Sequence, residues 1–401
     1  MDRVILHVDQ NAFFASVEAL SHPETMGKPM AVCGDPENRR GIVLAKNELA
    51  KKAGVKTAES VWQALRKCPG LILLPPHHHL YAEYCDRANE IYERFTDLVE
   101  RAGIDESYLD VTGTQHLFGS GREIAGKIRQ TIREELGLTV SVGVSFCKVF
   151  AKLGSDYKKP DATTEITRNN VQSLLHPLPV TDLMYVGRAT ADALAEIGVH
   201  TVGQLAALDR GVLTARLGKH GSLLYDYANG LDREPVRRSE DGAQAKSVGN
   251  SLTFRRDLVS REDVRVGLRV LSESVAYRLR RHGKKCRGVQ VAIRDTALRT
   301  IDRQTQLPQP THLTKTIYEA ALALVLRFWK PGQPIRLLAV TAINLTDGEE
   351  SGQLSLFEAP PQADPKQEAL DKSLDDLKSR YGKTVVRPAS ILKNDLGIEE
   401  E

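Results

Sequence analysis

Apolar runs and helical stripes alternate along the first 165 residues. Strands are expected where apolar residues are continuous or alternate with polar ones, and helices where they recur at steps of three and four. The predicted strands are residues 4–8, 41–45, 107–112 and 138–146, the last of them half-buried. The predicted helices are a short stretch from Phe14, residues 80–100 and residues 124–136, the last of which stops at Gly137.

The order of these elements predicts a fold class. When residues 13–74 are set aside as an insertion, the chain runs strand, helix, strand, helix, strand, which is close to a split βαβ arrangement. Residues 166–233 are expected to be helical, with Gly187 in a turn between two short helices. After a polar linker at 234–245, residues 246–345 run strand, helix, strand, strand, helix, strand. We therefore expect an α+β protein with several domains.

Length and composition narrow the class of protein. A chain of 401 residues suggests two to four domains, and its 41% apolar and 27% charged residues are those of an ordinary soluble protein. No apolar run approaches the ~18 residues of a membrane helix, and the chain starts with a strand pattern instead of a signal peptide. The five scattered cysteines favour a reducing compartment, so we expect a cytoplasmic location. The tract His77–His79 predicts a polar turn in preference to a metal site.

The net charge of +3 conceals an uneven distribution. Residues 246–345 hold 19 Lys and Arg against 7 Asp and Glu, a net +12, whereas residues 346–401 are at −6. A basic block beside near-neutral segments is typical of a module that binds a polyanion, because a merely solvated surface would mix both signs. Six cations crowd the turn after the first helix of this block, where they would reach phosphates: Arg278, Arg280, Arg281, Lys284, Lys285 and Arg287.

Three acidic residues carry the candidate chemistry. Asp9 ends the first strand, and Asp105 and Glu106 begin another in GIDESYLDVT. Strand ends can bring carboxylates together, and clustered carboxylates are costly unless positive charge lies among them. Carboxylates and substrate phosphates are the ligands that Mg²⁺ prefers, and two such ions can clamp both oxygens of a phosphoryl transfer. Taken singly, each acid can equally be a solvated charge.

Longer motifs around these acids resemble the Y-family of DNA polymerases. HVDQNAFFASVE (7–18), GIDESYLDVT (103–112) and SVGVSFCKVFAKLGSDYKKPD (141–161) stand in the order and spacing of that family. VGRATADALAEIGVHTVGQLA (186–206) is similar to its helix–hairpin–helix, and KSVGNSLTFRRDL (246–258) to the start of its extra DNA-binding domain. Three ordered motifs of this length are far more specific than a single short one.

The resemblance covers roughly residues 1–357 and implies a domain layout. It implies a palm with a split βαβ (ferredoxin-like) sheet, a small fingers insertion, a helical thumb with the helix–hairpin–helix, and a separate α+β little-finger domain. The implied boundaries are palm 1–12 and 75–165, fingers 13–74, thumb 166–233, linker 234–245, little finger 246–345, and an acidic tail 346–401.

The resemblance also implies roles for residues. Two Mg²⁺ ions would lie between Asp9, Asp105 and Glu106, with Glu106 as the catalytic carboxylate nearest the primer 3′-hydroxyl. Phe14 would be the steric gate that excludes a ribose 2′-OH, while simple core packing also accounts for Phe13. The residues implied in nucleotide binding are Gln10, Phe13, Phe14, Lys51 and Lys159. The residues implied in DNA binding are Gly187, Arg188, Lys246, Arg255, Arg281, Lys284 and Lys285.

The tail adds a separate indication. Gln353, Leu354, Leu356 and Phe357 resemble the short peptide by which bacterial polymerases dock on the sliding clamp. An extended polar tail that presents Leu and Phe can anchor in an apolar pocket of a partner. The implied partners are primer–template DNA, deoxynucleoside triphosphates and the sliding clamp, with no membrane, and the protein is expected to be a monomer.

Some positions depart from the pattern of the family. Where the finger helix usually holds Thr, Tyr and Arg, this chain has Ala45, Glu48 and Lys51, and Cys147 replaces a usual Asn. A carboxylate within about 4 Å of a phosphate would cost on the order of 1–4 kcal/mol unless it turned away or paired with a neighbouring lysine. We therefore expect triphosphate binding to be weakened or rearranged. Asp110 is expected to be a structural or solvated acid.

The sequence favours a template-directed DNA polymerase of the translesion type, without proofreading. The alternative is a clamp-tethered DNA-binding protein with weak or lost polymerase activity, supported only by the departures at the finger helix. A nucleotide cyclase on a similar palm would leave the basic block and the clamp-like peptide without a role.

Overall fold

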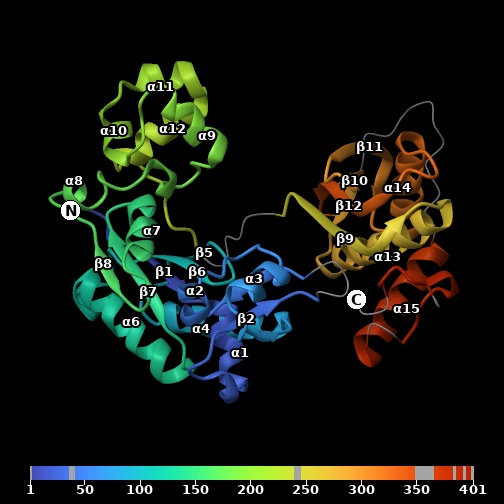
Figure 1. The fold of residues 1–401 in the computed structure, drawn as a ribbon, viewed down its shortest axis with the longest axis horizontal. Coiled ribbons are helices and arrows are strands. Elements are labelled where there is room, and N and C mark those ends of the chain that lie inside the picture. The colour runs from blue at the N-terminus through green and yellow to red at the C-terminus, as the bar shows by residue number, and fades with distance from the viewer. Residues whose placement is uncertain are drawn as a thin grey trace. The chain divides into compact units, whose positions relative to one another are not determined.

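The structure, a computed structural model, describes residues 2–35, 41–238, 245–347, 365–382, 385–391 and 394–398. It divides into one compact unit of residues 1–34 and 42–242 and a second of residues 35–41 and 243–401 (Figure 1). The clamp-like residues Gln353, Leu354, Leu356 and Phe357 lie outside the described residues. No described helix is both long and apolar enough to cross a bilayer.

A five-stranded sheet forms the centre of the first unit. Its order is β5 (Val99–Arg101), β6 (Glu106–Asp110), β1 (Ile5–Gln10), β7 (Val140–Ser145) and β8 (Thr163–Glu165). Strand β1 pairs antiparallel with both β6 and β7. Leu6 and Val8 pack into the same core as helices α4 (His78–Glu93) and α6 (Gly121–Leu136). Successive side chains of a strand alternate between faces, so His7 and Asp9 point to the other face, which α7 (Lys148–Tyr157) covers.

The structure corrects three sequence predictions in this unit. Strand β7 is buried along its whole length because helices pack on both faces. Gly143 permits the close approach of α7, since an added Cβ would lie 1.8 Å from the carbonyl oxygen of Ala151. The helix expected over 80–100 ends at Glu93, because Val99–Arg101 pairs with β6 instead. His77 precedes α4 as its N-cap and the rest of the histidine tract enters the helix, so the expected turn is absent there.

The insertion after β1 has a small sheet of its own. After α1 (Phe13–Ser21) and a 3₁₀ turn (Pro23–Thr25), the strands β3 (Val43–Lys46), β2 (Met30–Cys33) and β4 (Ile72–Leu74) lie side by side in that order. Two short helices, α2 (Glu48–Lys52) and α3 (Val61–Lys67), complete the insertion. Its core is formed by few side chains, among them Ala31, Val43 and Leu71.

Residues after β8 are helical, as the sequence predicts. Helix α5 (Gln115–Phe118) belongs to the sheet region, and the later helices are α8 (Val171–Leu174), α9 (Arg188–Ala195), α10 (Val202–Ala207), α11 (Arg210–Leu217) and α12 (Lys219–Ala228), with a 3₁₀ turn at Val180–Asp182. Gly187 is the N-cap of α9, so the expected glycine turn is confirmed.

The start of the expected linker is bound to the sheet region. Val236 is 4% exposed and packs with Ile5 and Tyr108. The guanidinium of Arg3 donates to the carbonyl oxygen of Glu234 at 2.9 Å, and the Arg237 N–H donates to the Glu100 carboxylate at 2.8 Å. The described part of the linker, up to residue 238, is therefore part of the first unit, contrary to the sequence prediction.

The second unit contains the predicted strand, helix, strand, strand, helix, strand order. Its elements are β9 (Ser247–Leu258), α13 (Arg261–Arg281), β10 (Lys285–Asp295), β11 (Thr300–Thr311), α14 (Thr314–Phe328) and β12 (Ile335–Thr346). The sheet order is β11-β10-β12-β9, with every neighbouring pair antiparallel. Both helices pack against this sheet and against each other around one apolar core.

The described part of the tail from residue 365 onward packs against this unit. Helix α15 (Pro365–Tyr381) turns Asp371 and Asp375 toward Arg280, with N–O distances of 3.0 and 2.6 Å. Arg280 is thereby buried in ion pairs, which corrects the expectation that it reaches phosphates. Among the described residues 385–391, a 3₁₀ turn spans Ala389–Ile391.

Candidate active site

The acidic residues at the strand ends meet in the sheet. Asp9 lies directly opposite Glu106 in the antiparallel register of β1 and β6. The Gln10 N–H donates to the Asp105 carbonyl oxygen at 3.0 Å, so the backbone fixes the third acid beside the first. Asp9 is only 6% exposed, and Asp105 and Glu106 are half-buried. The sequence prediction that these acids converge is supported at the level of the backbone.

Two lysines neutralise these carboxylates. Lys159 Nζ lies 2.7 Å from Asp9 Oδ2 and also 2.7 Å from Asp156 Oδ1. Lys152 Nζ lies 2.7 Å from Glu106 Oε1. Both lysines come from α7 and the loop after it, which cover the face of β1 on which Asp9 lies. The cations therefore arrive with the helix that closes this side of the sheet.

The pKa values differ among the three acids. Burial raises the pKa of Asp9 to about 7, against the opposing effect of Lys159, and the charge of Glu106 adds to the rise. Burial and the same Glu106 charge raise the pKa of Asp105. The pKa of Glu106 is lowered by its contacts with His7 and Lys152. One acid of the group is thus held ionised, while its neighbours resist ionisation.

His7 supports Glu106 from inside the sheet. It is fully buried, its Nδ1 lies 2.8 Å from Ser155 Oγ, and burial lowers its pKa, so the ring is neutral. Its Nε2 lies 3.5 Å from Glu106 Oε2, too far for a well-formed hydrogen bond. Lys152 is therefore the firmer partner of Glu106, and His7 limits where that carboxylate can turn.

The donor set suits a hard divalent cation in its chemistry. Three carboxylates from adjacent strand ends, two of them with raised pKa values, would gain from added positive charge. As placed, the side chains of Asp9 and Glu106 turn to lysines. Within the described ranges, no three His, Cys, Asp or Glu side chains are gathered closely enough to hold one ion. The backbone fits a metal site, and binding an ion would require these carboxylates to leave their lysines.

The loop after β1 is held in one shape. Ala12 has the left-handed φ of 47° that starts α1, a conformation that costs energy for a residue other than glycine. Asn11 donates to Ser141 Oγ at 2.9 Å and accepts from the Asp161 N–H at 2.7 Å. Gln10 is 3% exposed, and its side-chain oxygen has no hydrogen-bond partner within the described residues. Backbone N–H groups in such a fixed loop can face an anion.

The two phenylalanines of the loop differ. Phe13 is 3% exposed and lies in the main core, as simple packing predicts. Phe14 is half-buried and stacks on Tyr81, with ring centroids 4.0 Å apart and planes at 11°. The Tyr81 hydroxyl donates to the buried Glu18 carboxylate, which also contacts the His77 ring. Phe14 therefore stacks on a Tyr81 ring that a hydrogen bond to Glu18 holds in place.

Of the positions that depart from the family pattern, Ala45 lies in β3 and packs on the same small cluster as Phe14, whereas Glu48 and Lys51 lie in α2. Glu48 pairs with Lys51, with Nζ–Oε1 at 3.4 Å, which is one of the pairings expected from the sequence. Lys46 donates to Thr57 Oγ1 at 2.9 Å. Cys147 is fully buried, and burial raises the pKa of its thiol to about 12. Asp110 accepts from Thr112 N–H at 2.9 Å, so its expected structural role is confirmed.

The expected DNA-binding residues are distributed over both units. Gly187 and Arg188 are exposed at the N-terminus of α9 in the first unit. In the second unit Lys246, Arg255 and Arg281 are exposed. Lys285 is half-buried in β10, and Lys284 forms an ion pair with Asp347.

Sequence reasoning missed His7 and Lys152. His7 is two residues before Asp9 on the same face of a strand, which is a signal that the alternation of side chains provides. Lys152 gives no such signal, because Lys159 lies in the loop after α7 and the two lysines share no helical face. The alternation of side chains does not identify Glu106 as the partner either, because that depends on how α7 crosses the sheet.

Comparison with known proteins assigns most of the chain to one family. The model of the impB/mucB/samB family matches residues 8–156, and the model of the C-terminal domain of the same family matches residues 245–356. DNA polymerase IV of Acetivibrio thermocellus is 48% identical over 398 residues, which cover 99% of this chain and 99% of that protein. DNA polymerase IV 1 of Bacillus subtilis is 38% identical over 394 residues, which cover 98% of this chain and 94% of that protein.

A solved structure gives the same answer. The model of this chain superposes on a Y-family DNA polymerase chimera with a TM-score of 0.76 and 26% identity, covering 85% of this chain and 98% of the other. The fold agreement extends across the palm-like sheet and the separate C-terminal sheet domain. The chain therefore belongs to the Y-family of DNA polymerases and is related to bacterial DNA polymerase IV.

Proposed function

We propose that this protein is a translesion DNA polymerase that adds deoxynucleotides to a primer 3′ end on a template, by two-metal phosphoryl transfer and without proofreading. The observation that carries this proposal is the register that sets Asp9 opposite Glu106. A backbone hydrogen bond from the Gln10 N–H to the Asp105 carbonyl oxygen holds the third acid beside them. Its implied domain layout is the palm, fingers, thumb and little finger with the boundaries expected from the sequence. The names of the relatives support the polymerase activity.

Asp9, Asp105 and Glu106 are the residues that would hold the two Mg²⁺ ions. When bound, such ions would lower the pKa of the attacking 3′-hydroxyl and stabilise charge on the α-phosphate and the leaving oxygen. The chain itself supplies an ionised Glu106, held by Lys152, at the position nearest the primer end. The fixed loop of residues 10–14 and Lys159 would orient the triphosphate.

Lys159 has two tasks under this proposal. In the structure its ammonium group neutralises Asp9. An incoming triphosphate offers a denser negative charge, so Lys159 can transfer to a phosphate and leave the Asp9 carboxylate for a metal ion. The lysine thereby keeps a buried acid stable before substrate arrives.

The alternative, a clamp-tethered DNA-binding protein with weak or lost polymerase activity, rests on the finger helix. Glu48 is paired with Lys51 there, so a carboxylate and its lysine compensate each other where phosphate ligands are expected. The catalytic carboxylates and both lysines of the site are all present. That retention favours the polymerase.

Replacement Asp105→Ala should lower primer extension on the order of a thousandfold, because several kcal/mol of metal-assisted stabilisation are lost. The measurement is single-nucleotide extension of a primer–template with Mg²⁺. Glu90→Ala, an exposed acid on α4, is the matched control and should extend as the wild type does. Absence of synthesis by the wild type would favour the DNA-binding alternative.

Replacement Phe14→Ala should let ribonucleotides be incorporated, because the ring that would meet a 2′-hydroxyl is removed. The ratio of kcat/KM for deoxyribonucleotide and ribonucleotide is the measurement, and it should fall by at least about tenfold. Tyr81→Phe keeps the ring that supports Phe14 and removes only the hydroxyl, which donates to Glu18 and accepts from the His77 N–H, so it should retain selectivity. Unchanged selectivity in Phe14→Ala would place the gate elsewhere.

The raised pKa of Asp9 predicts a pH-dependent stability in the absence of metal. The folded chain keeps a proton on Asp9 up to about pH 7, whereas the unfolded chain loses it near pH 3.9. The folded state binds more protons on Asp9 between these values, so the contribution of Asp9 to stability falls as the pH rises from about 4 to about 7, whereas the lowered pKa of His7 acts in the opposite direction. Asp9→Asn should remove this loss and be more stable than the wild type at pH 8 by a few kcal/mol.

Urea denaturation in chelator at pH 4 and pH 8 measures this difference. Asp156→Asn, which removes the other, more exposed carboxylate that contacts Lys159, is the control and should leave the pH dependence in place. Magnesium should stabilise the wild type at pH 8 and have little effect on Asp9→Asn. The same pH dependence of stability in the wild type and in Asp9→Asn would contradict the assignment.

The proposal includes docking on the sliding clamp through Gln353, Leu354, Leu356 and Phe357, on the strength of sequence alone. Deletion of residues 353–357 should leave unassisted extension unchanged and remove stimulation by added clamp. Extension with and without clamp is the comparison. Stimulation retained by the deletion variant would refute this part.

A further inference from the structure

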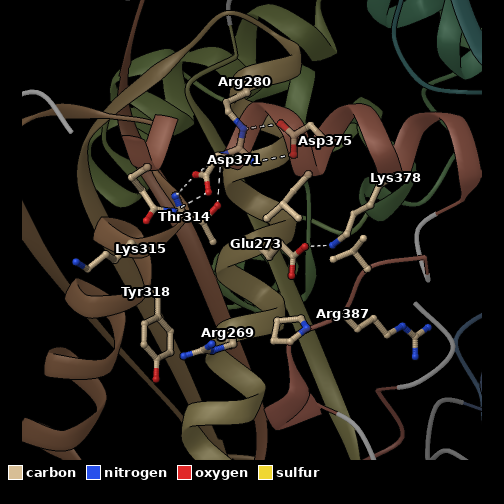
Figure 2. A pocket seen from close by; sticks show the side chains of 14 residues that line it. Arg269, Glu273, Arg280, Thr314, Lys315, Tyr318, Asp371, Asp375, Lys378 and Arg387 are labelled. Atoms are coloured by element: carbon tan, nitrogen blue, oxygen red, sulfur yellow. Dashed lines mark hydrogen bonds and ion pairs between the residues drawn. The ribbon is translucent and has the colours of Figure 1, made fainter. Parts of the chain in front are cut away.

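A cleft of about 370 Å³ lies between the helices of the second unit (Figure 2). Its walls come from α13, α14, α15 and residues 386–388, and no strand of the four-stranded sheet lines it. The volume is within the range of pockets that bind small ligands or single side chains of a partner. The cleft is separate from the open face of the sheet and from the acids of the candidate active site.

The carboxylates in the inner part of the cleft are paired with cations of the protein. Arg280 forms ion pairs with Asp371 and Asp375, and the Thr314 N–H donates to Asp371 at 2.9 Å. Lys378 contacts Glu273. Figure 2 shows these acids engaged with cations of the protein itself. They do not offer a free negative charge to a ligand.

The outer part carries excess positive charge. Five cations line the cleft against three carboxylates. Arg269 lies over the ring of Tyr318, with its guanidinium carbon 5.2 Å from the ring centroid, and Lys315 is exposed beside it. Within the described residues, neither Arg269 nor Lys315 contacts a carboxylate. Burial lowers the pKa of Lys378, and the charge of Arg387 adds to this effect.

The floor between these charges is apolar. Leu374, Val386 and Pro388 line the cleft and are only half-buried, although aliphatic side chains gain from full burial. A ligand that has only charged groups would leave these apolar side chains exposed to water. A guanidinium stacked on an aromatic ring keeps its N–H edge available for a carboxylate, so Arg269 is already oriented for an acidic group.

We propose that this cleft binds a peptide segment of a partner protein in which acidic residues flank one large apolar side chain. The apolar side chain would fill the floor at Leu374, and the flanking carboxylates would meet Arg269 and Lys315. A nucleic-acid strand fits less well, because its phosphates could meet the cations but it has no aliphatic or aromatic side chain to fill the apolar floor at Leu374, Val386 and Pro388. Exposed ion pairs contribute little to affinity, because water screens them, so the apolar anchor provides most of it.

The test uses the full-length protein and a fluorescein-labelled peptide with one Phe flanked on each side by three Glu. Fluorescence anisotropy should show saturable binding, weakened at least about tenfold by Arg269→Gln combined with Lys315→Gln. The control pair Arg265→Gln and Arg327→Gln removes exposed cations from the same two helices outside the cleft, and should bind as the wild type does. Thermal midpoints and primer extension should be unchanged in both pairs.

Two further probes separate the anchor from the charge. A peptide with Ser in place of Phe should bind at least about tenfold more weakly, and so should one with Gln in place of every Glu. A six-nucleotide single strand of thymidine should not displace the labelled peptide. The proposal is overturned if the wild type does not bind the peptide, if the control pair loses as much affinity as the cleft pair, or if the oligonucleotide competes for the cleft.

Discussion

The candidate site depends on one constraint, which is that two acids on opposing strands must share a buried face of the sheet. The register that sets Asp9 against Glu106 follows from pairing β1 with β6, and a slip of one strand by one residue would put the two acids on opposite faces of the sheet. Burial there makes charge expensive, so the face can exist only with cations beside it. Lys152 and Lys159 provide them, which explains why the helix that closes this face carries lysines at its inner side.

Much of the fold followed from apolar spacing, because the physical cause was local. The stripe over 124–136 and the glycine after it predicted α6, whose Gly137 ends the helix with a φ of 68°. The whole order of the basic block was predicted as well, since each element there has a clear period. The wrong predictions were at positions where a residue distant in the sequence determines the local structure. Val99–Arg101 extends a helical pattern in sequence but forms β5 because β6 offers it a free edge.

The site was predicted in part for the same reason. Strand ends identified the three acids, and adjacency in the sheet brought them together as expected. The roles of His7 and Lys152 depend on how α7 crosses the sheet. That crossing is possible because Gly143 has no side chain and the Ala151 carbonyl can approach its backbone closely. A glycine in the middle of a buried strand was visible in the sequence. The helix that packs on this glycine could not be predicted, because it is a separate element of the chain.

Charge decides how helix α15 is placed, whereas the end of the tail is held by burial of Ile391, Leu396 and Ile398 in the apolar core of the second unit. Of the three leucines that recur along α15 at steps of four and three, only Leu374 lines the cleft, and Leu370 and Leu377 are 51% and 40% exposed. Helix α15 turns its acids inward because Asp371 and Asp375 compensate Arg280, and breaking such a buried pair costs about 3–5 kcal/mol.

The acidic tail and the basic block are therefore not two electrostatic modules. Asp347 pairs with Lys284, and Asp395 with Arg256 at 2.7 Å, so the described part of the tail neutralises cations that net charge alone would assign to DNA. The cations that remain available are fewer than the net +12 of the block suggests. The positions of these cations matter more than their number, because only cations spaced to contact successive phosphates can hold the DNA in one orientation.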